Sequence, residues 1–200
     1  MFKFSKNWRK YLEEGELSTS GITSQSGLHP IFWYRRQLDA KVRRKLIKIA
    51  EDVLNKVKII DCSWHMPQTK RNGFEEYKTQ HIPESIFFDL DDNSDKNTNL
   101  PHMLVNKNEW EKIVSNMGIK NEDMIIIYDN SDVVSSCRCW FNFIYYGHDP
   151  KLVHVLNGGL KKWLEEKRKV TNNLSKVMKS DYKSFENQEL VKNKDSINQN

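Results

Sequence analysis

Three cysteines are the residues of this 200-residue sequence that could act as nucleophiles. A cysteine reacts as its thiolate, and it does so where neighbouring groups lower its pKa. Cys137 and Cys139 are separated by one residue, which is not the Cys-x-x-Cys spacing of redox and zinc sites. Both fall in a predicted helix, and Cys62 ends a predicted strand. Small packed thiols are therefore the favoured interpretation of all three.

The other motifs indicate neither a cofactor nor a metal. Gly158 and Gly159 separate a predicted strand from a helix, where a turn with positive φ favours glycine. They do not form a Gly-x-Gly-x-x-Gly dinucleotide fingerprint. The odd number of cysteines gives no disulfide framework, which favours a reducing compartment, and we expect a cytoplasmic protein. The charged start and the absence of an apolar run near 20 residues predict neither a secretory signal nor a membrane span.

Composition favours a packed domain with a charged surface. Hydrophobic residues make up 38% of the sequence, which is enough for a core and argues against a disordered chain. The net charge of +5 comes from a lysine-rich composition, and a solvated surface is favoured over an acidic partner. Apolar residues at steps of three and four predict a basic amphipathic helix over 38–53. We interpret its charged face as solvated and expect no nucleic-acid partner.

Strands and helices alternate from residue 57 onward. Strands are predicted near 58–61, 86–88, 125–128 and 153–156, and helices over 107–117, 135–146 and 160–166. The segment 125–128 is continuously apolar, which is typical of a strand buried on both faces. Alternation of this kind predicts an α/β fold, with a parallel sheet flanked by helices on both faces.

Six segments, in order, resemble one family, the tandem rhodanese enzymes that act as thiosulfate and 3-mercaptopyruvate sulfurtransferases. Two of them carry the strongest likeness, HIPESIFFDLD at 81–91 and VLNGGLKKW at 155–163. The others are IDCSWHMP at 60–67, PHML at 101–104, Tyr128-Asp129, and the positions Arg138, Trp140 and 146–148. The resemblance implies a rhodanese-like domain over 46–167. It leaves 1–45 as an unplaced basic extension, and 168–200 as a linker and the start of a second module.

The resemblance also implies that this domain lacks the nucleophile. Such enzymes pair two rhodanese modules, and the second carries the cysteine in a Cys-Gly-x-Gly loop. The loop's N–H groups, at a helix N-terminus, stabilise the thiolate that takes up sulfur. Asp129 stands at that position here and cannot carry a sulfane sulfur, although it can accept the loop's N–H bonds. No catalytic residue is therefore predicted within this chain.

The resemblance implies that three further residues line the cleft between modules. Asp91 and His102 match residues that face the cysteine loop, where a carboxylate fixes the tautomer of an imidazole and tunes its proton transfer. The alternative is that both merely hold their own loop by local hydrogen bonds. For Arg138 we favour a structural role, tying down the Asp129 loop, over substrate binding.

The resulting prediction is the first module of a sulfurtransferase that moves sulfane sulfur from thiosulfate or 3-mercaptopyruvate to a thiol or cyanide. Its expected partners are a second, catalytic rhodanese module, covalent or in trans, and small sulfur-containing anions. That module is not in these 200 residues, so we expect a fragment, or a truncated or fused product, that is inactive alone. The alternative is an inactive rhodanese-like module that recognises a protein partner.

Overall fold

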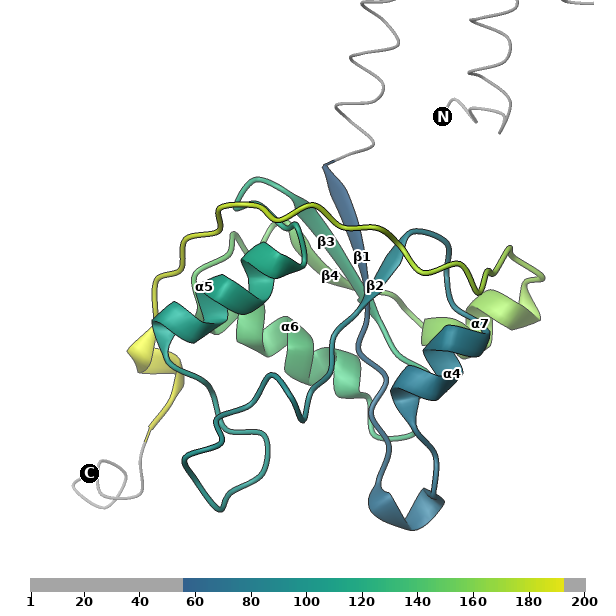
Figure 1. Ribbon diagram of the computed structural model, residues 1–200, viewed down its shortest axis with the longest axis horizontal. Helices are drawn as coiled ribbons and strands as arrows, with labels where there is room; N and C mark the ends of the chain where they lie inside the picture. Colours follow the sequence, from purple (N-terminus) through teal and green to yellow (C-terminus); the bar gives the residue numbers. More distant parts are fainter. Residues whose placement is uncertain (1–55, 193–200) are drawn as a thin grey trace, which may run out of the picture. The chain divides into compact units, whose positions relative to one another are not determined.

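A four-stranded parallel sheet forms the centre of the protein in a computed structural model, which describes residues 56–192 (Figure 1). The strands are β1 (Val57–Asp61), β2 (Ser85–Phe87), β3 (Met124–Tyr128) and β4 (Val153–Val155), in the order β2-β1-β3-β4. All three pairings are parallel, and β3 lies between two neighbours. The predicted parallel sheet, with its most apolar strand inside, is confirmed.

The register of the sheet brings the ends of three strands to one edge. Asp61, the last residue of β1, pairs with Phe87 on one side and with Tyr128 on the other. The loops after β1, β2 and β3 therefore begin side by side. In open parallel sheets this carboxyl edge is where ligands bind.

Three helices connect the strands, α4 (Gly73–Thr79), α5 (Lys107–Asn116) and α6 (Ser135–Tyr145), and a fourth, α7 (Gly159–Glu165), follows β4. Short 3-10 turns lie at η1 (Pro67–Thr69) and η2 (Gln188–Leu190). Asn72 and Asn106 cap α4 and α5 by accepting the backbone N–H groups of Glu75 and Glu109. Helix α4 was not predicted from the sequence, because it buries a single residue, Tyr77, and so shows no apolar repeat.

Helices cover both faces of the sheet, as predicted. In Figure 1, α5 and α6 lie on one side and α4 and α7 on the other. Because side chains alternate along a strand, neighbouring residues of β1 enter different cores. Ile60 joins the larger core with Trp110 and Phe143, whereas Ile59 packs against the smaller core that contains Tyr128 and Leu160.

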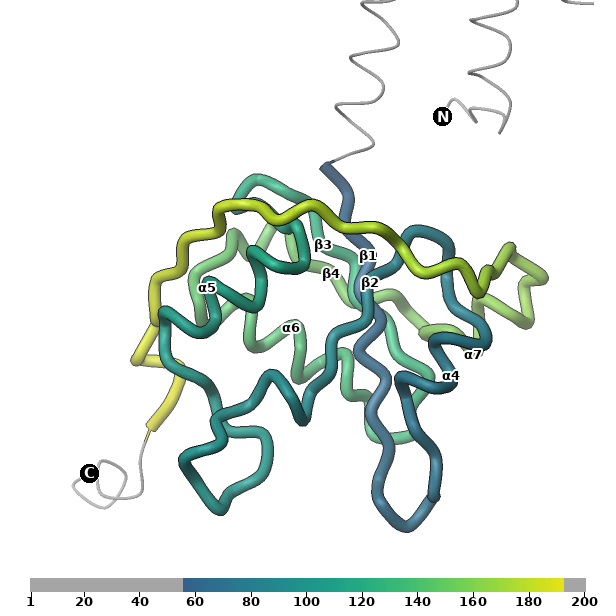
Figure 2. Tube along the Cα trace, viewed as in Figure 1, coloured from purple at the N-terminus to yellow at the C-terminus, as the bar shows by residue number. Residues whose placement is uncertain are grey.

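The C-terminal segment, residues 168–192, runs in an extended path across the domain (Figure 2). Thr171 forms an antiparallel bridge with His81 near its start. Further along, Tyr182 is completely buried in the larger core, and the Phe185 N–H donates to the Tyr146 carbonyl at 2.9 Å. The part of the predicted linker that the structure describes is thus packed on the domain.

The predicted basic helix over 38–53 and the extension 1–45 lie outside the described residues, as do residues 193–200. Within residues 56–192, no helix has the length and apolar character needed to cross a membrane. The same part of the chain contains no group of three side chains that could hold a metal ion.

Candidate functional site

The carboxyl edge of the sheet carries a row of buried polar residues. Asp61 ends β1, and its carboxylate accepts the N–H of Ser63 at 2.9 Å and the Ser63 hydroxyl at 2.6 Å. Burial raises the pKa of Asp61 above its ordinary value. The Ser63 hydroxyl in turn accepts the N–H of Asn130 at 2.8 Å. The loops after β1 and β3 are therefore joined through one serine.

Asp91 and His102 lie in contact, on the loop that follows β2. His102 Nε2 is 2.7 Å from Asp91 Oδ1. The other oxygen, Oδ2, accepts the indole N–H of Trp64 at 2.9 Å. The Trp64 and His102 rings meet edge-on, with centroids 4.8 Å apart and planes at 84°. The pairing inferred for Asp91 and His102 is present, and Trp64 joins them from the loop after β1.

Arg138 contacts the same cluster and not the loop that was predicted. Its guanidinium donates a hydrogen bond to the backbone carbonyl of His102. The prediction that Arg138 ties down the Asp129 loop is therefore wrong, because this side chain of α6 extends toward the loop after β2. Burial lowers the pKa of Arg138, and among the described residues its Nε has no acceptor.

The loop after β2 is also held by its own hydrogen bonds. The Ser94 hydroxyl donates to the Leu90 carbonyl at 2.6 Å, the Asp95 N–H to the Met103 carbonyl at 2.9 Å, and Lys96 Nζ to the Asp91 carbonyl at 2.7 Å. These bonds fix the backbone without the Asp91 carboxylate. The two oxygens of that carboxylate bond the side chains of His102 and Trp64.

Asp129 is buried at the start of the loop after β3. Its Oδ2 accepts the N–H of Ser136, in the first turn of α6, at 2.7 Å. Other donors of this loop have acceptors of their own: Asn130 N–H bonds Ser63, and Ser135 N–H bonds the Ser131 hydroxyl at 3.3 Å. An anionic side chain thus lies at the helix N-terminus, which favours negative charge.

The three cysteines are free thiols. Cys62 and Cys139 are completely buried, and burial raises the pKa of Cys62 well above its ordinary value. A buried thiol with a raised pKa is a poor nucleophile at neutral pH. Cys137 is exposed on α6. The structure places two of the three as small packed residues.

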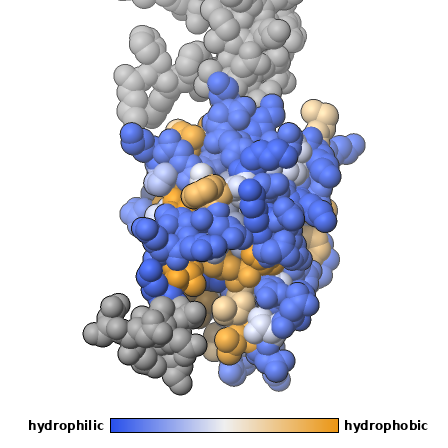
Figure 3. Space-filling model, turned by 90° about the vertical axis from the view of Figure 1, so that its left-hand side faces the viewer, coloured by the Kyte–Doolittle hydropathy of each residue, from blue (hydrophilic) through white to orange (hydrophobic). Residues whose placement is uncertain are grey.

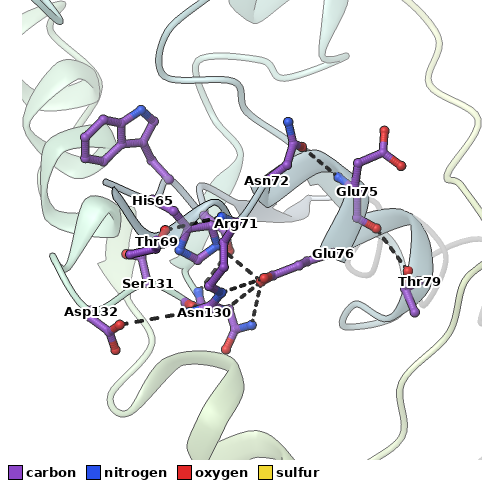
Figure 4. Close-up of polar contacts among 12 residues, drawn as sticks. His65, Thr69, Arg71, Asn72, Glu75, Glu76, Thr79, Asn130, Ser131 and Asp132 are labelled. Carbon is purple, nitrogen blue, oxygen red and sulfur yellow. Dashed lines mark hydrogen bonds and ion pairs between the residues drawn. The ribbon is translucent and has the colours of Figure 1, made fainter. Parts of the chain in front are cut away.

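A second polar cluster closes over the same edge (Figure 4). Arg71 binds both oxygens of Glu76, at 2.6 and 2.7 Å, and donates to the Asn130 carbonyl at 3.1 Å. Glu76 Oε2 also accepts from the Asn130 side chain at 3.0 Å and lies 3.2 Å from His65 Nε2. Asn130 is therefore held by its N–H, its carbonyl and its amide. We call Arg71, Glu76 and Asn130 the loop clamp. The loop clamp was not predicted, because its members come from separate segments of the sequence.

Comparisons with known proteins agree on one family. The model of the rhodanese-like domain matches residues 45–166. The chain is 44% identical over 107 residues to thiosulfate/3-mercaptopyruvate sulfurtransferase 1 of Arabidopsis thaliana, covering 54% of the chain and 28% of that protein. It is 32% identical over 146 residues to rat (Rattus norvegicus) thiosulfate sulfurtransferase, covering 72% of the chain and 48% of that protein. The chain thus spans less than half the length of these relatives.

Solved structures give the same result. A 3-mercaptopyruvate sulfurtransferase from Escherichia coli matches with a TM-score of 0.68 at 27% identity, over 76% of this chain and 58% of that one. The Tum1 protein of Saccharomyces cerevisiae matches with a TM-score of 0.58 at 32% identity, over 65% of this chain and 43% of that one.

Proposed function

This chain belongs to the rhodanese-like domain family, and we propose that it is the first, non-catalytic module of a two-module sulfurtransferase. One observation carries the proposal. The loop that follows β3 holds a buried aspartate, Asp129, where a rhodanese nucleophile would stand, while the loop beside it presents the contacting pair Asp91 and His102. The contacting pair suits proton transfer, and Cys62, the thiol that directly follows β1 at this edge, is completely buried.

The proposed reaction places the nucleophile on the partner module. A cysteine thiolate of that module attacks the outer sulfur of thiosulfate or the thiol sulfur of 3-mercaptopyruvate. The S–S or C–S bond breaks, sulfite or the enolate of pyruvate leaves with the electron pair, and a persulfide forms. A thiol or cyanide then takes the outer sulfur and regenerates the thiolate. His102 exchanges a proton with the sulfur-containing group at the cleft, and Asp91 fixes the proton on Nε2, since a carboxylate only accepts.

Exposed apolar side chains close to His102 and Asp129 in the sequence support the binding of a partner module at this edge. Leu100 and Met103 belong to the same loop as His102, and Val133 and Val134 belong to the loop after Asp129. Their exposed fractions range from 40% to 61%. Figure 3 shows a mostly hydrophilic face on which apolar side chains gather in the lower half. A catalytic rhodanese module that buried these side chains would also cover His102.

The test is a chimera in which residues 45–192 of this chain, which include the C-terminal segment packed on the domain, replace the segment of the Arabidopsis thaliana sulfurtransferase that aligns with them. We expect sulfur transfer from 3-mercaptopyruvate or thiosulfate, and a loss of about 100-fold or more for His102→Gln and Asp91→Asn. His154→Gln, at an exposed position of β4, is the control and keeps full activity. A folded chimera with no turnover, or one indifferent to His102→Gln, would contradict the proposal.

The chain by itself is expected to be inactive with either donor, because Cys62 is buried and Asp129 is not a nucleophile. Turnover by the isolated chain that disappears in Cys137→Ser would place the active site on α6 instead. An inactive chimera that still binds a protein through the Leu100 and Val134 surface would favour the alternative, a rhodanese-like binding module. The cytoplasmic location and the missing second module remain predictions.

A further inference from the structure

Side chains from three separate segments converge on His102. Trp64 comes from the loop after β1, Asp91 from the loop after β2, and Arg138 from α6. Asp91 shares the loop of His102, whereas Trp64 and Arg138 reach it from two other elements. The convergence therefore indicates that the position of this ring matters.

The backbone of His102 is itself strained. Its φ is +56°, in the left-handed region that favours glycine. Such a conformation persists in a non-glycine residue where the surroundings over-determine it, and it is frequent at functional sites. Here the guanidinium of Arg138 holds the His102 carbonyl. The Arg138 bond fixes the backbone but leaves the ring free to rotate about its side-chain torsions.

Trp64 supplies the missing constraint on the ring. Its indole N–H holds Asp91 Oδ2 at 2.9 Å, which turns Oδ1 toward His102 Nε2 at 2.7 Å. Its ring meets the imidazole edge-on at 4.8 Å, which limits rotation of the imidazole plane. The Trp64 backbone is anchored in turn, because its N–H donates to the Ser135 hydroxyl at the start of α6.

We propose that Trp64 is a positioning residue that fixes the Asp91 carboxylate and the His102 ring as one unit, leaving Nδ1 free to exchange a proton with a sulfur-containing group at the module cleft. No described residue donates to or accepts from His102 Nδ1, and the side chain is 23% exposed. The catalytic purpose of this positioning rests on the proposed function. The positioning itself is a property of this chain alone.

The first test is NMR of the full chain labelled with nitrogen-15. The chain has six histidines, and the His102 ring signals are identified by their loss in His102→Gln. Trp64→Phe keeps an aromatic ring and removes the N–H. We expect the His102 Nε2 proton to exchange with water roughly fivefold faster in Trp64→Phe, the factor set by one net hydrogen bond.

The matched control is Trp163→Phe. Trp163 also donates its indole N–H, to the Lys169 carbonyl at 2.8 Å, but from α7. This variant should leave His102 exchange unchanged. Equal exchange in wild type and Trp64→Phe would overturn the positioning role, whatever the activity of the chimera.

The second test introduces the same two variants into the chimera. Trp64→Phe should lower kcat several-fold with KM unchanged, because the ring is misplaced while substrate binding is not altered; Trp163→Phe should change neither. An inactive chimera, together with faster exchange of the His102 proton in Trp64→Phe, would contradict the proposed function and still support the positioning role of Trp64. Altered exchange with an unchanged kcat in an active chimera overturns the catalytic purpose assigned to Trp64.

Discussion

The hydroxyl group of Tyr182 lies 3.2 Å from Nδ1 of His148, and the two rings are stacked with an angle of 4° between their planes. His148 Nε2 lies 2.9 Å from the Asp123 carbonyl, which can only accept, so Nε2 carries the proton. Nδ1 of the neutral ring then accepts from Tyr182. Both residues are buried, and this contact joins the C-terminal segment to the domain.

Removal of the Tyr182 hydroxyl should weaken the attachment of this segment. Tyr182→Phe leaves His148 Nδ1 buried without a donor, which costs about 1–3 kcal/mol. We expect a loss of that size in the free energy of unfolding, measured by urea denaturation at neutral pH. Tyr145→Phe is the control, since no described residue bonds the Tyr145 hydroxyl. A Tyr182→Phe midpoint equal to that of the control would show that the contact does not hold the segment.

Stability should also decrease in mild acid because of His148. Burial lowers the pKa of this imidazole below its ordinary value of 6.5, and Asp123, Asp149 and the Tyr182 hydroxyl are the neighbouring titratable groups. The unfolded chain binds the proton more readily than the folded one. The contribution is thus fully present above about pH 6.5 and is lost as the pH falls toward the folded value. Urea midpoints of the wild type should drop between pH 7 and 5.

The variant His148→Gln isolates this effect from the other histidines. Glutamine can replace part of the hydrogen bonding and does not titrate. Its midpoint should therefore start lower at pH 7 and change less toward pH 5. Parallel pH profiles for the two proteins would assign the acid sensitivity to another group.

The sequence predicted the sheet because its signals are local. The continuous apolar run of β3 and the strand and helix alternation follow from burial on both faces, and they appear within short windows. Helix α4 was not predicted, because its single buried residue gives no apolar repeat. Tyr182 was an isolated apolar residue in a polar tail, and only its contact with His148 reveals that it belongs to the core.

The candidate site was predicted only in part, because local motifs can be recognised in the sequence whereas contacts between loops cannot. Asp91 and His102 were identified through motifs that keep their spacing, and the two residues are in contact. Trp64 lies within such a motif, but its role depends on where two loops meet in space. Arg138 was assigned to the wrong loop, because a position on a helix does not tell which neighbour a long side chain reaches.

Disruption of the loop clamp should loosen the loop after β3. Arg71→Gln removes two charged hydrogen bonds to Glu76 and one to the Asn130 carbonyl. About a third of each side chain is exposed, so solvent screening limits the expected loss to about 1 kcal/mol. Lys78→Gln breaks the more exposed pair with Glu75 and should cost less than half as much.

Two measurements check this prediction. Urea midpoints give the global cost, and amide hydrogen exchange at Asn130 reports on the loop itself. The loss should fade in acid, because Arg71 lowers the pKa of Glu76 below its ordinary value of 4.5. A carboxylate with a lowered pKa stabilises above the unfolded value, and the contribution disappears as the pH falls through the folded one. Unchanged exchange at Asn130 in Arg71→Gln would contradict a clamp.

Asp129 should stabilise the fold as an internal anion at the start of α6. Its carboxylate accepts the Ser136 N–H at the first turn of α6, where negative charge gains about 0.3–1 kcal/mol, and up to about 2 when partly buried. Asp61 opposes this gain through repulsion, although Asp129 is the smallest of the causes that raise the Asp61 pKa. We therefore expect Asp129→Asn, which keeps the shape and removes the charge, to cost about 1 kcal/mol in urea denaturation at neutral pH. Asp132→Asn, in the same loop, serves as the control. The Asp132 side chain is 92% exposed and lies 3.9 Å from Arg71, so solvent screening makes this ion pair weak and the midpoint should change little. Equal midpoints for Asp129→Asn and Asp132→Asn would show that the buried carboxylate does not stabilise the fold.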